Sequence, residues 1–407
     1  MFLLLDLLYL ALLPLIAFTM LLGRLRGHPP RSGLAARFGV GETLPPSNNR
    51  ILIHAVSVGE VNAIRNFVTQ LASRGYDLTI SVTTDTGMNR AEELYGATHT
   101  VVRYPVDLSW SVKKFLTRIN PKLVVLVELE VWPNMLKVIE QRHIRVVVVN
   151  GRLSDRSFTR YSRVSWLLRK TFGRLTWVGM QNEAYATKVQ SLGAKHVEVL
   201  GTMKWDNAII QDSVEGAEEL SKNLKIDSSK PLIVAGSTTP EEHELLRKIM
   251  SDDLQLLVAP RRPEWFDEAA QTLAPCNRRT ESQRTDTNFF VLDTIGELTA
   301  AYSLATIVVI GRSFAPMHGS DPTEPIGLGK PTIIGPNVSD FTDIIHAFTS
   351  GEGIVQCSQD ELKDVIYELL SNNDRCRTLV ENGRKIIQSN QGATTQYVQL
   401  VEKTLLQ

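Results

Sequence analysis

An apolar run that ends in a turn and leads into a helical pattern most constrains the fold of this chain. Residues 51–56 are mostly apolar without alternation and rich in β-branched types, which predicts a strand buried on both faces. Residues 60–71 carry apolar residues at helical spacing. Glu60 therefore lies at a strand-to-helix turn, where open α/β sheets bind ligands. That position suits either a catalytic carboxylate or plain charge complementarity with the helix dipole.

The same strand–turn–helix pattern recurs along the whole chain. It predicts strands at residues 51–56, 78–83, 99–104, 122–128, 145–150, 177–182 and 196–200, and then at 231–235, 254–259, 289–292, 306–310, 331–334 and 353–355. Strands that alternate with helices in this way form βαβ units and a parallel sheet. The predicted fold class is α/β, with two Rossmann-like domains that face a cleft.

A chain of 407 residues is too long for one ordinary core, so we expect two main domains. We predict a membrane-anchor helix at 1–24, an N-terminal domain at 25–205, and an inter-domain region at 206–228 where the sequence turns polar. A C-terminal domain follows at 229–385, and a last helix at 386–407 is expected to pack back on the first half.

The composition excludes several classes of protein. Apolar content of 43% and charged content of 22% are typical of a folded globular protein, and the 44 basic residues balance the 44 acidic ones. No global field therefore marks a nucleic-acid binder. The three cysteines are far apart and form no C-x-x-C pair, which argues against a disulfide framework or a zinc site and fits a reducing compartment.

The N-terminus is the compositional exception. Residues 1–22 are apolar except for Asp6, Pro14 and Thr19, and this length is about what a hydrocarbon core requires. Four arginines follow before the next acidic residue, which predicts that the main body lies on the cytoplasmic side. The alternative is a buried or interfacial first helix.

Familiar cofactor signatures are missing from the sequence. No G-x-G-x-x-G follows the first strand, and no P-loop, H-E-x-x-H or G-x-S-x-G pattern occurs. We therefore predict no cofactor and no protein-held catalytic metal.

Polar residues do follow the predicted strands. Glu128 and Glu130 end one strand, where residues two apart point to the same side, although a pair of surface acids is an equal alternative. In the second half, four strands are followed by segments suited to an anion, by backbone N–H groups, hydroxyls or a guanidinium: 236–239, 260–263, 296–297 and 318–325. Four such loops in one domain favour a site for an anionic nucleotide.

Arginines recur after the strand at 145–150. Arg152, Arg156, Arg160 and Arg163 have the spacing of one helical face. Such a face is usually only solvated, but beside a membrane anchor it would meet anionic lipid headgroups.

Taken together, the motifs resemble one family. They are residues 53–60 (IHAVSVGE), 83–87 (TTDTG), 128–134 (ELEVWPN), 150–154 (NGRLS), 181–183 (QNE), 201–206 (GTMKWD), 260–261 (PR), 293–298 (DTIGEL) and the Glu324-Pro325 pair. The chain is similar, nearly end to end, to lipid A-specific 3-deoxy-D-manno-octulosonic acid (Kdo) transferases. The resemblance implies a GT-B glycosyltransferase that transfers Kdo from CMP-Kdo to a lipid A precursor (lipid IVA) in lipopolysaccharide biosynthesis, at the cytoplasmic face of the inner membrane.

The resemblance also implies roles for individual residues. Glu60 would be the general base, and Glu130 and Lys204 would stabilise the transition state. CMP contacts would fall on Pro260, Arg261, Ile295, Gly296, Glu297, Asp321, Pro322, Thr323 and Glu324. Candidates for contact with the acceptor or with lipid headgroups are Ser57, Gly59, Arg152, Arg156 and Arg160. The implied partners are CMP-Kdo, a lipid A precursor and membrane lipids, without nucleic acid.

The chain departs from the family pattern only in its second half. The family has Ser-Thr-His after the first strand of this half, and here Thr239 replaces the histidine. The family's Pro-Arg-His-Pro has Arg262 in place of its histidine, and its Gly-Gly-His-Asn is His318-Gly319-Ser320-Asp321. A related ulosonic acid donor, a nucleotide-sugar epimerase and a membrane scaffold with a decayed donor site are the alternative interpretations.

Overall fold

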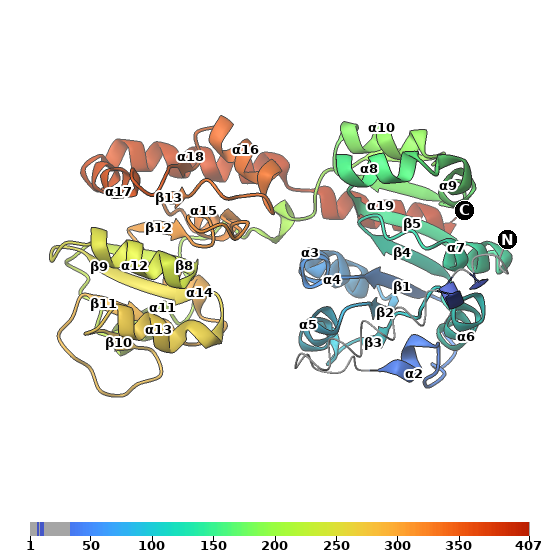
Figure 1. Ribbon diagram of the computed structural model, residues 1–407, viewed down its shortest axis with the longest axis horizontal. Coiled ribbons are helices and arrows are strands. Elements are labelled where there is room, and N and C mark those ends of the chain that lie inside the picture. The colour runs from blue at the N-terminus through green and yellow to red at the C-terminus, as the bar shows by residue number, and fades with distance from the viewer. Residues whose placement is uncertain (1–5, 8, 12–32, 407) are drawn as a thin grey trace. The chain divides into compact units, whose positions relative to one another are not determined.

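The computed structural model describes residues 6–7, 9–11 and 33–406 and divides the chain into two compact units (Figure 1). Unit 1 comprises the chain up to Asn207 together with the segment from Gln391 onward, and unit 2 comprises Ala208–Asn390. Among the described residues, each unit is built on one sheet of seven parallel strands. The predicted α/β class with two parallel sheets is confirmed.

The sheet of unit 1 has the order β3-β2-β1-β4-β5-β6-β7. Its strands are β1 Arg50–Ala55, β2 Asp77–Val82, β3 Thr100–Arg103, β4 Leu123–Val127, β5 Arg145–Gly151, β6 Trp177–Met180 and β7 Val197–Val199. The order reverses between β1 and β4, which pair directly through Ile51 and Leu123. The turns that follow β1 and β4 therefore open at a topological switch point, where sheets of this kind bind ligands.

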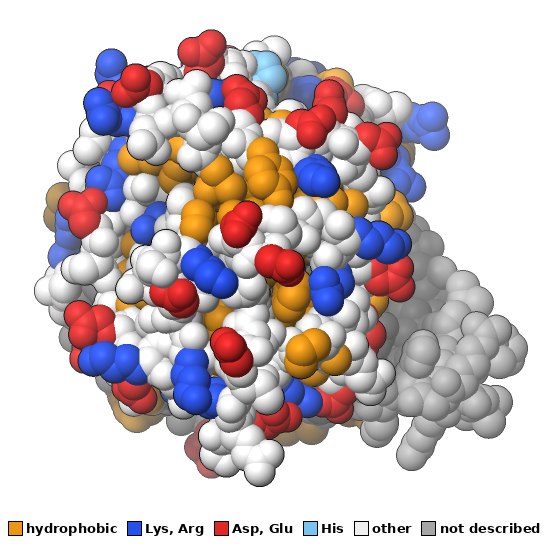
Figure 2. All heavy atoms as spheres, turned by 90° about the vertical axis from the view of Figure 1, so that its left-hand side faces the viewer, with side chains coloured by type: hydrophobic (Ala, Val, Ile, Leu, Met, Phe, Trp, Pro, Cys, Tyr) orange, Lys and Arg blue, Asp and Glu red, His pale blue; other side chains and the backbone are white. Residues whose placement is uncertain are grey.

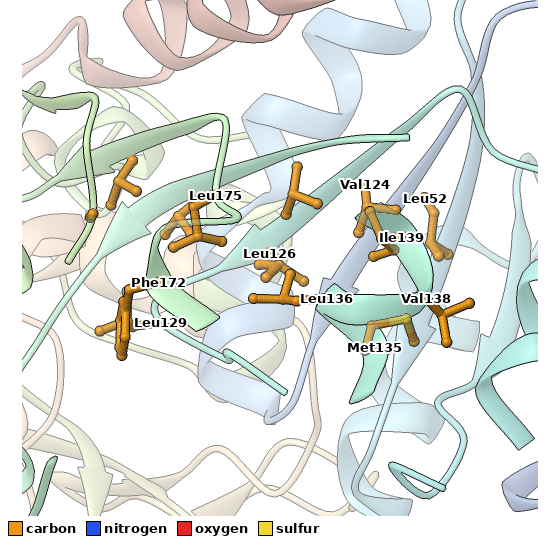
Figure 3. Packing of buried hydrophobic residues seen from close by; sticks show 14 of the residues in the cluster. Leu52, Val124, Leu126, Leu129, Met135, Leu136, Val138, Ile139, Phe172 and Leu175 are labelled. Atoms are coloured by element: carbon orange, nitrogen blue, oxygen red, sulfur yellow. The ribbon is translucent and has the colours of Figure 1, made fainter. Parts of the chain in front are cut away.

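Helices cover both faces of this sheet. They are α2 Leu34–Arg37, α3 Val58–Ala63, α4 Arg65–Ser73, α5 Asp85–Tyr95, α6 Ser109–Ile119, α7 Pro133–Gln141, α8 Asp155–Ser162, α9 Ser165–Phe172, α10 Glu183–Ser191 and α19 Ala393–Leu406. Alternate residues of β1, β4 and β5 enter different core clusters, as the period of two requires. Figure 3 shows one cluster, in which Met135 and Ile139 of α7 pack near Leu52 and Val124 of the sheet.

Helix α19 completes the core of unit 1 although it comes last in the chain. Tyr397 is fully buried and its hydroxyl donates to the Gly201 carbonyl at 2.8 Å. Gly179 of β6 leaves room for this ring, because a Cβ there would lie 2.4 Å from it. At the start of α19, the N–H groups of Gly392 and Thr394 donate hydrogen bonds to the carboxylate of Asp206.

Unit 2 repeats the architecture with the strand order β10-β11-β9-β8-β12-β13-β14. Its strands are β8 Leu232–Thr238, β9 Gln255–Pro260, β10 Asn277–Arg278, β11 Phe289–Val291, β12 Ile307–Ile310, β13 Thr332–Ile334 and β14 Val355–Gln356. The sequence did not predict β10, because two polar residues carry no periodic signal.

The helices of unit 2 are α11 Ala217–Leu224, α12 Pro240–Ile249, α13 Phe266–Thr272, α14 Leu298–Leu304, α15 Thr323–Gly327, α16 Thr342–Ser350, α17 Leu362–Ser371 and α18 Asn373–Asn390. In the chain, α11 precedes the first strand of unit 2, and the other helices lie between or after the strands. Helix α11 falls within the stretch 206–228 that the sequence suggests as an inter-domain region. Its Leu220 and Leu224 are buried within unit 2. Figure 2 shows one face on which acidic and basic side chains are interspersed, in keeping with the balanced charge.

Most of the predicted anchor helix at 1–24 lies outside the described residues. Within the part of the chain that the structure describes, no helix combines the length and apolar character needed to cross a membrane.

The packing of α19 predicts a large loss of stability when its aromatic anchor is truncated. Tyr397→Ala should lower the free energy of unfolding by about 3–5 kcal/mol, as expected for a large buried aromatic side chain. Tyr397→Phe should cost only about 1 kcal/mol, because it removes one hydrogen bond. Urea denaturation followed by circular dichroism measures both, with Leu406→Ala, at a position 89% exposed, as the neutral control.

Candidate active site

The Glu60 carboxylate is fixed at the turn between β1 and α3. Ser57 is the N-cap of α3, and its hydroxyl oxygen accepts the Glu60 N–H at 3.4 Å. In return, the Ser57 hydroxyl donates to Glu60 Oε1 at 2.9 Å, and the Val56 N–H donates to Oε2 at 2.7 Å. The strand–turn–helix prediction is confirmed here, and the carboxylate has a defined position at the carboxyl edge of the sheet.

The surroundings of Glu60 disfavour its negative charge. The side chain is 7% exposed, and burial is the main reason that its pKa rises to about 7. The Val56 and Ser57 hydrogen bonds lower the pKa, whereas the nearby charges of Glu128 and Glu130 raise it. A carboxyl group with a pKa near 7 can accept a proton from a reacting hydroxyl at neutral pH.

Glu128 and Glu130 lie in the turn after β4, next to β1 in the sheet. Glu128 has a positive φ of 57°, and its N–H donates to the Val149 carbonyl at 2.9 Å. Glu128 and Glu130 line a pocket of about 320 Å³ together with Leu129 of the same turn. Its other walls come from the β5–α8 loop and α8: Arg152, Leu153, Ser154, Ser157 and Tyr161. The predicted pair of carboxylates lines one pocket, but through the turn after β4 and not through the alternation of a strand.

Electrostatic coupling connects this pair with Lys204. Burial raises the pKa of Glu128, and the charges of Lys204 and Arg152 lower it. Burial also raises the pKa of Glu130, with Glu128 as the next cause. The backbone before Lys204 is held by Asn150, whose side-chain oxygen accepts the Met203 N–H at 3.1 Å. Charge interactions in unit 1 thus link the three predicted catalytic residues, Glu60 directly to Glu130, and Lys204 through Glu128.

The predicted basic helical face is wrong in part. Ser154 caps α8 by accepting the Ser157 N–H at 3.3 Å, so the helix begins after Arg152 rather than with it. Arg152 lines the pocket instead, and Arg163 is the C-cap of α8. Only Arg156 and Arg160 lie within the helix, and both are exposed.

A buried aromatic cluster beside the carboxylates was not predicted. His54 of β1 stacks on Tyr104 with ring centroids 3.7 Å apart, and Tyr104 lies 6.0 Å from Trp132. Burial lowers the pKa of His54 to about 3, so the ring stays neutral while its Nδ1 bonds Ser81. His54 Nε2 and Tyr104 Oη find no partner among the described residues, whereas the Trp132 side chain hydrogen-bonds the Glu130 carboxylate and lowers its pKa. The only signal in the sequence was a histidine inside an apolar strand.

The loop at 236–239 was predicted to offer its backbone N–H groups to a bound anion, and the structure differs from this prediction. Glu242 occupies the position expected for an anion, since its carboxylate accepts the N–H groups of Thr239, Arg312, Ser313 and Phe314 at 2.8–3.0 Å. Thr239 and Glu242 form a capping box at the start of α12. The protein's own carboxylate therefore satisfies this helix start and the turn after β12.

A histidine is nevertheless present near the site where the family pattern has one. His243 of α12 is fully buried; its Nε2 lies 2.7 Å from the Thr238 hydroxyl, and its Nδ1 lies 2.8 Å from Glu268. Burial lowers the pKa of His243, against the opposing effect of Glu268. The Thr238 carbonyl in turn accepts the Arg261 N–H at 2.9 Å. Hydrogen bonds therefore connect His243, through Thr238, with the residue that follows β9.

The predicted nucleotide-binding residues lie at three strand ends of unit 2. Pro260 ends β9, and Arg261 after it is exposed. Ile295 is 81% exposed beside Gly296, whose φ of 100° favours glycine.

The remaining predicted nucleotide contacts are partly engaged within the unit. The Glu297 carboxylate pairs with Arg279 at 3.0 Å, and Glu324 accepts a hydrogen bond from the Thr299 hydroxyl. Asp321 accepts from the N–H and hydroxyl of Thr323 at 2.9 and 2.7 Å, and Pro322 is the N-cap of α15. In the described residues, no group of three His, Cys, Asp or Glu side chains is arranged to hold a metal ion.

Comparisons with known proteins agree with this geometry. The family model for 3-deoxy-D-manno-octulosonic-acid transferase matches residues 32–207, which lie in unit 1. The 3-deoxy-D-manno-octulosonic acid transferase of Haemophilus influenzae is 28% identical over 92% of each chain, and that of Bordetella pertussis is 28% identical over 91% of each. This chain is a glycosyltransferase related to the Kdo transferases.

The fold of this glycosyltransferase is also that of distant solved structures. A glycosyltransferase from Rickettsia africae has a TM-score of 0.59 at 13% identity and covers 89% of this chain and 100% of its own. Such a match shows the two-sheet GT-B-like fold and nothing finer.

The raised pKa of Glu60 predicts a pH-dependent loss of stability. An acid whose pKa rises from 4.5 to about 7 on folding stabilises the protein below pH 4.5, and this contribution is lost as the pH rises through 7. Between pH 4.5 and 8, the free energy of unfolding of the wild type should fall by up to about 3 kcal/mol relative to that of Glu60→Gln. Urea denaturation of both proteins at these pH values tests this; parallel pH profiles would contradict it.

Proposed function

We propose that this glycosyltransferase moves Kdo from CMP-Kdo to a lipid A precursor with inversion at the anomeric carbon. One observation carries the proposal: a buried carboxyl with a pKa near 7, Glu60, lies at the switch point beside Glu128 and Glu130. The similarity to 3-deoxy-D-manno-octulosonic acid transferases supports the identity of the sugar.

In the proposed reaction Glu60 acts as general base. It accepts the proton of an acceptor hydroxyl while that oxygen attacks the anomeric carbon of Kdo. The bond between this carbon and the phosphate oxygen breaks, and CMP leaves with the electron pair. Lys204 and Glu130 stabilise the charges that develop on the sugar and the leaving group. The proton then passes from Glu60 to water, and no covalent intermediate forms.

Unit 2 would hold the donor. The guanidinium of Arg261 suits the phosphate of CMP, because its planar set of donors matches phosphate oxygens. The exposed Ile295 beside Gly296 offers an apolar surface for the cytosine ring. Asp321, Pro322, Thr323, Glu324 and Glu297 are assigned to the same nucleotide.

Membrane association forms part of the proposal. The segment 1–24 would anchor the enzyme at the inner membrane with both units in the cytoplasm. On unit 1, Trp166 is 79% exposed and Val164 is 41% exposed between the exposed Arg160 and Lys170. Exposed aromatic and aliphatic side chains rimmed by cations suit the interface of an anionic bilayer.

The base role predicts a large loss of activity in Glu60→Gln. Transfer of radiolabelled Kdo from CMP-Kdo to a tetraacyl lipid A precursor should fall about 10²–10⁴-fold, because the hydroxyl loses its proton acceptor. Glu92→Gln, at an exposed position of α5, should keep wild-type activity. The base role is excluded if Glu60→Gln matches that control.

The donor site is tested by two neighbouring arginines. Arg261→Ala should raise KM for CMP-Kdo about tenfold or more, since loss of a charged hydrogen-bond donor typically costs about 1.5–3 kcal/mol. Arg262→Ala should change this KM little, because the Arg262 guanidinium is engaged with Trp265, its Cζ lying 5.0 Å from the ring centroid. Calorimetry with CMP measures the same contrast without turnover, and absence of cytidine nucleotide binding would favour a decayed donor site.

A further inference from the structure

The N-terminal apolar run contains a single acidic residue, Asp6, which an ordinary membrane helix would not need. Residues 6–7 and 9–11 are helical, and Asp6 and Tyr9 are half-buried on the side that contacts unit 1. Leu7 is 55% exposed and Leu10 is 46% exposed. This N-terminal helical segment therefore turns its polar side chains toward the protein and its apolar ones outward, the reverse of a surface helix.

Asp6 supplies the missing cap of α6. The residue at the N-cap position of α6 is Leu108, which has no side-chain hydrogen bond to offer. Asp6 Oδ1 accepts the N–H of Ser109, the first residue of the helix, at 2.9 Å, and Oδ2 accepts its hydroxyl. A carboxylate at a helix N-terminus satisfies free N–H groups and complements the helix dipole.

Helix α7 is capped from a distance as well. Its N-cap residue, Trp132, makes no capping hydrogen bond. The carboxylate of Asp107 instead accepts the N–H groups of Asn134 and Met135 at 3.0 and 2.8 Å. Tyr9 donates its hydroxyl to this same carboxylate at 3.3 Å.

Asn134 joins the two caps into one network. Its side-chain amide donates to Asp6 Oδ1 at 3.0 Å and to the Asp107 carbonyl at 2.6 Å. Asp107 is 5% exposed and Asn134 is fully buried, so water cannot easily replace a lost partner. The N-terminal helical segment is thus part of a buried polar network and does not merely lie against the surface.

This network lies at the start of the helix that follows the catalytic carboxylates. Glu130 precedes Trp132 and Pro133, and the fixed residues of α7 are Asn134 and Met135. Movement of the helix start would therefore displace the turn that carries Glu128 and Glu130.

We propose that Asp6 and Tyr9 are positioning residues that fasten the N-terminal helical segment to unit 1 by capping α6 and α7. The segment whose apolar side chains face outward for lipid thereby also fixes the turn that carries Glu130. The effect on catalysis rests on the proposed function, whereas the capping can be measured without it.

The test uses the full chain in vesicles of phosphatidylethanolamine and phosphatidylglycerol. Asp6→Leu makes the apolar run continuous, so vesicle binding by flotation should be unchanged or stronger. Hydrogen exchange at the starts of α6 and α7 should nevertheless become at least tenfold faster. Asp6→Asn, which keeps one acceptor oxygen, and Tyr9→Phe should give smaller increases. Leu7→Ala, on the outward side, should leave exchange at both helix starts unchanged.

Two further outcomes decide the proposal. If Asp6→Leu leaves exchange at Ser109, Asn134 and Met135 unchanged, the capping role is overturned. If exchange rises but kcat for Kdo transfer does not fall about fivefold or more, the link to Glu130 is overturned. An inactive wild-type enzyme would count against the proposed function, and the exchange data would still decide the capping.

Discussion

The rest of the site depends on the balance of two effects at Glu60: burial raises the pKa of its carboxyl group, and two hydrogen bonds lower it. The Val56 N–H and the Ser57 hydroxyl bind the charged form, whereas low exposure and two neighbouring carboxylates favour the neutral one. The balance places the pKa where the group can both take up and release a proton. Without the β1–α3 turn, the same glutamate would be an ordinary acidic residue at a helix start.

The topology of unit 1 brings the other groups to this carboxylate. Because β1 and β4 are neighbours and the chain diverges to opposite sides after them, their turns meet at one edge. Glu128 and Glu130 then act on Glu60 through their charge, and Lys204 acts on Glu128. The site is therefore an electrostatic set in which the pKa values of Glu60, Glu128 and Glu130 are all raised.

Local patterns predicted most of the fold, because uninterrupted apolar strands and helical spacing depend on residues close in sequence. They placed Glu60, Glu128 and Glu130 at strand ends correctly. They failed where a single local contact changed the geometry, as when the Ser154 cap separated Arg152 from the helix that follows. They also failed where the partner is distant in sequence: nothing in a linear pattern shows that Asp6 meets Ser109 or that Glu242 fills the turn after β12. Long-range contacts of this kind are set by packing, which periodicity does not record.

The position of α19 has a consequence for synthesis of the chain. All seven strands of the unit 1 sheet come before Asn207, yet the helix that packs on β5 and β6 is translated only after the whole of unit 2. While unit 2 emerges from the ribosome, an apolar strip around Gly179 and Val149 lacks its cover. The chain of unit 2 is therefore complete before that of unit 1, whose core needs the last helix of the sequence.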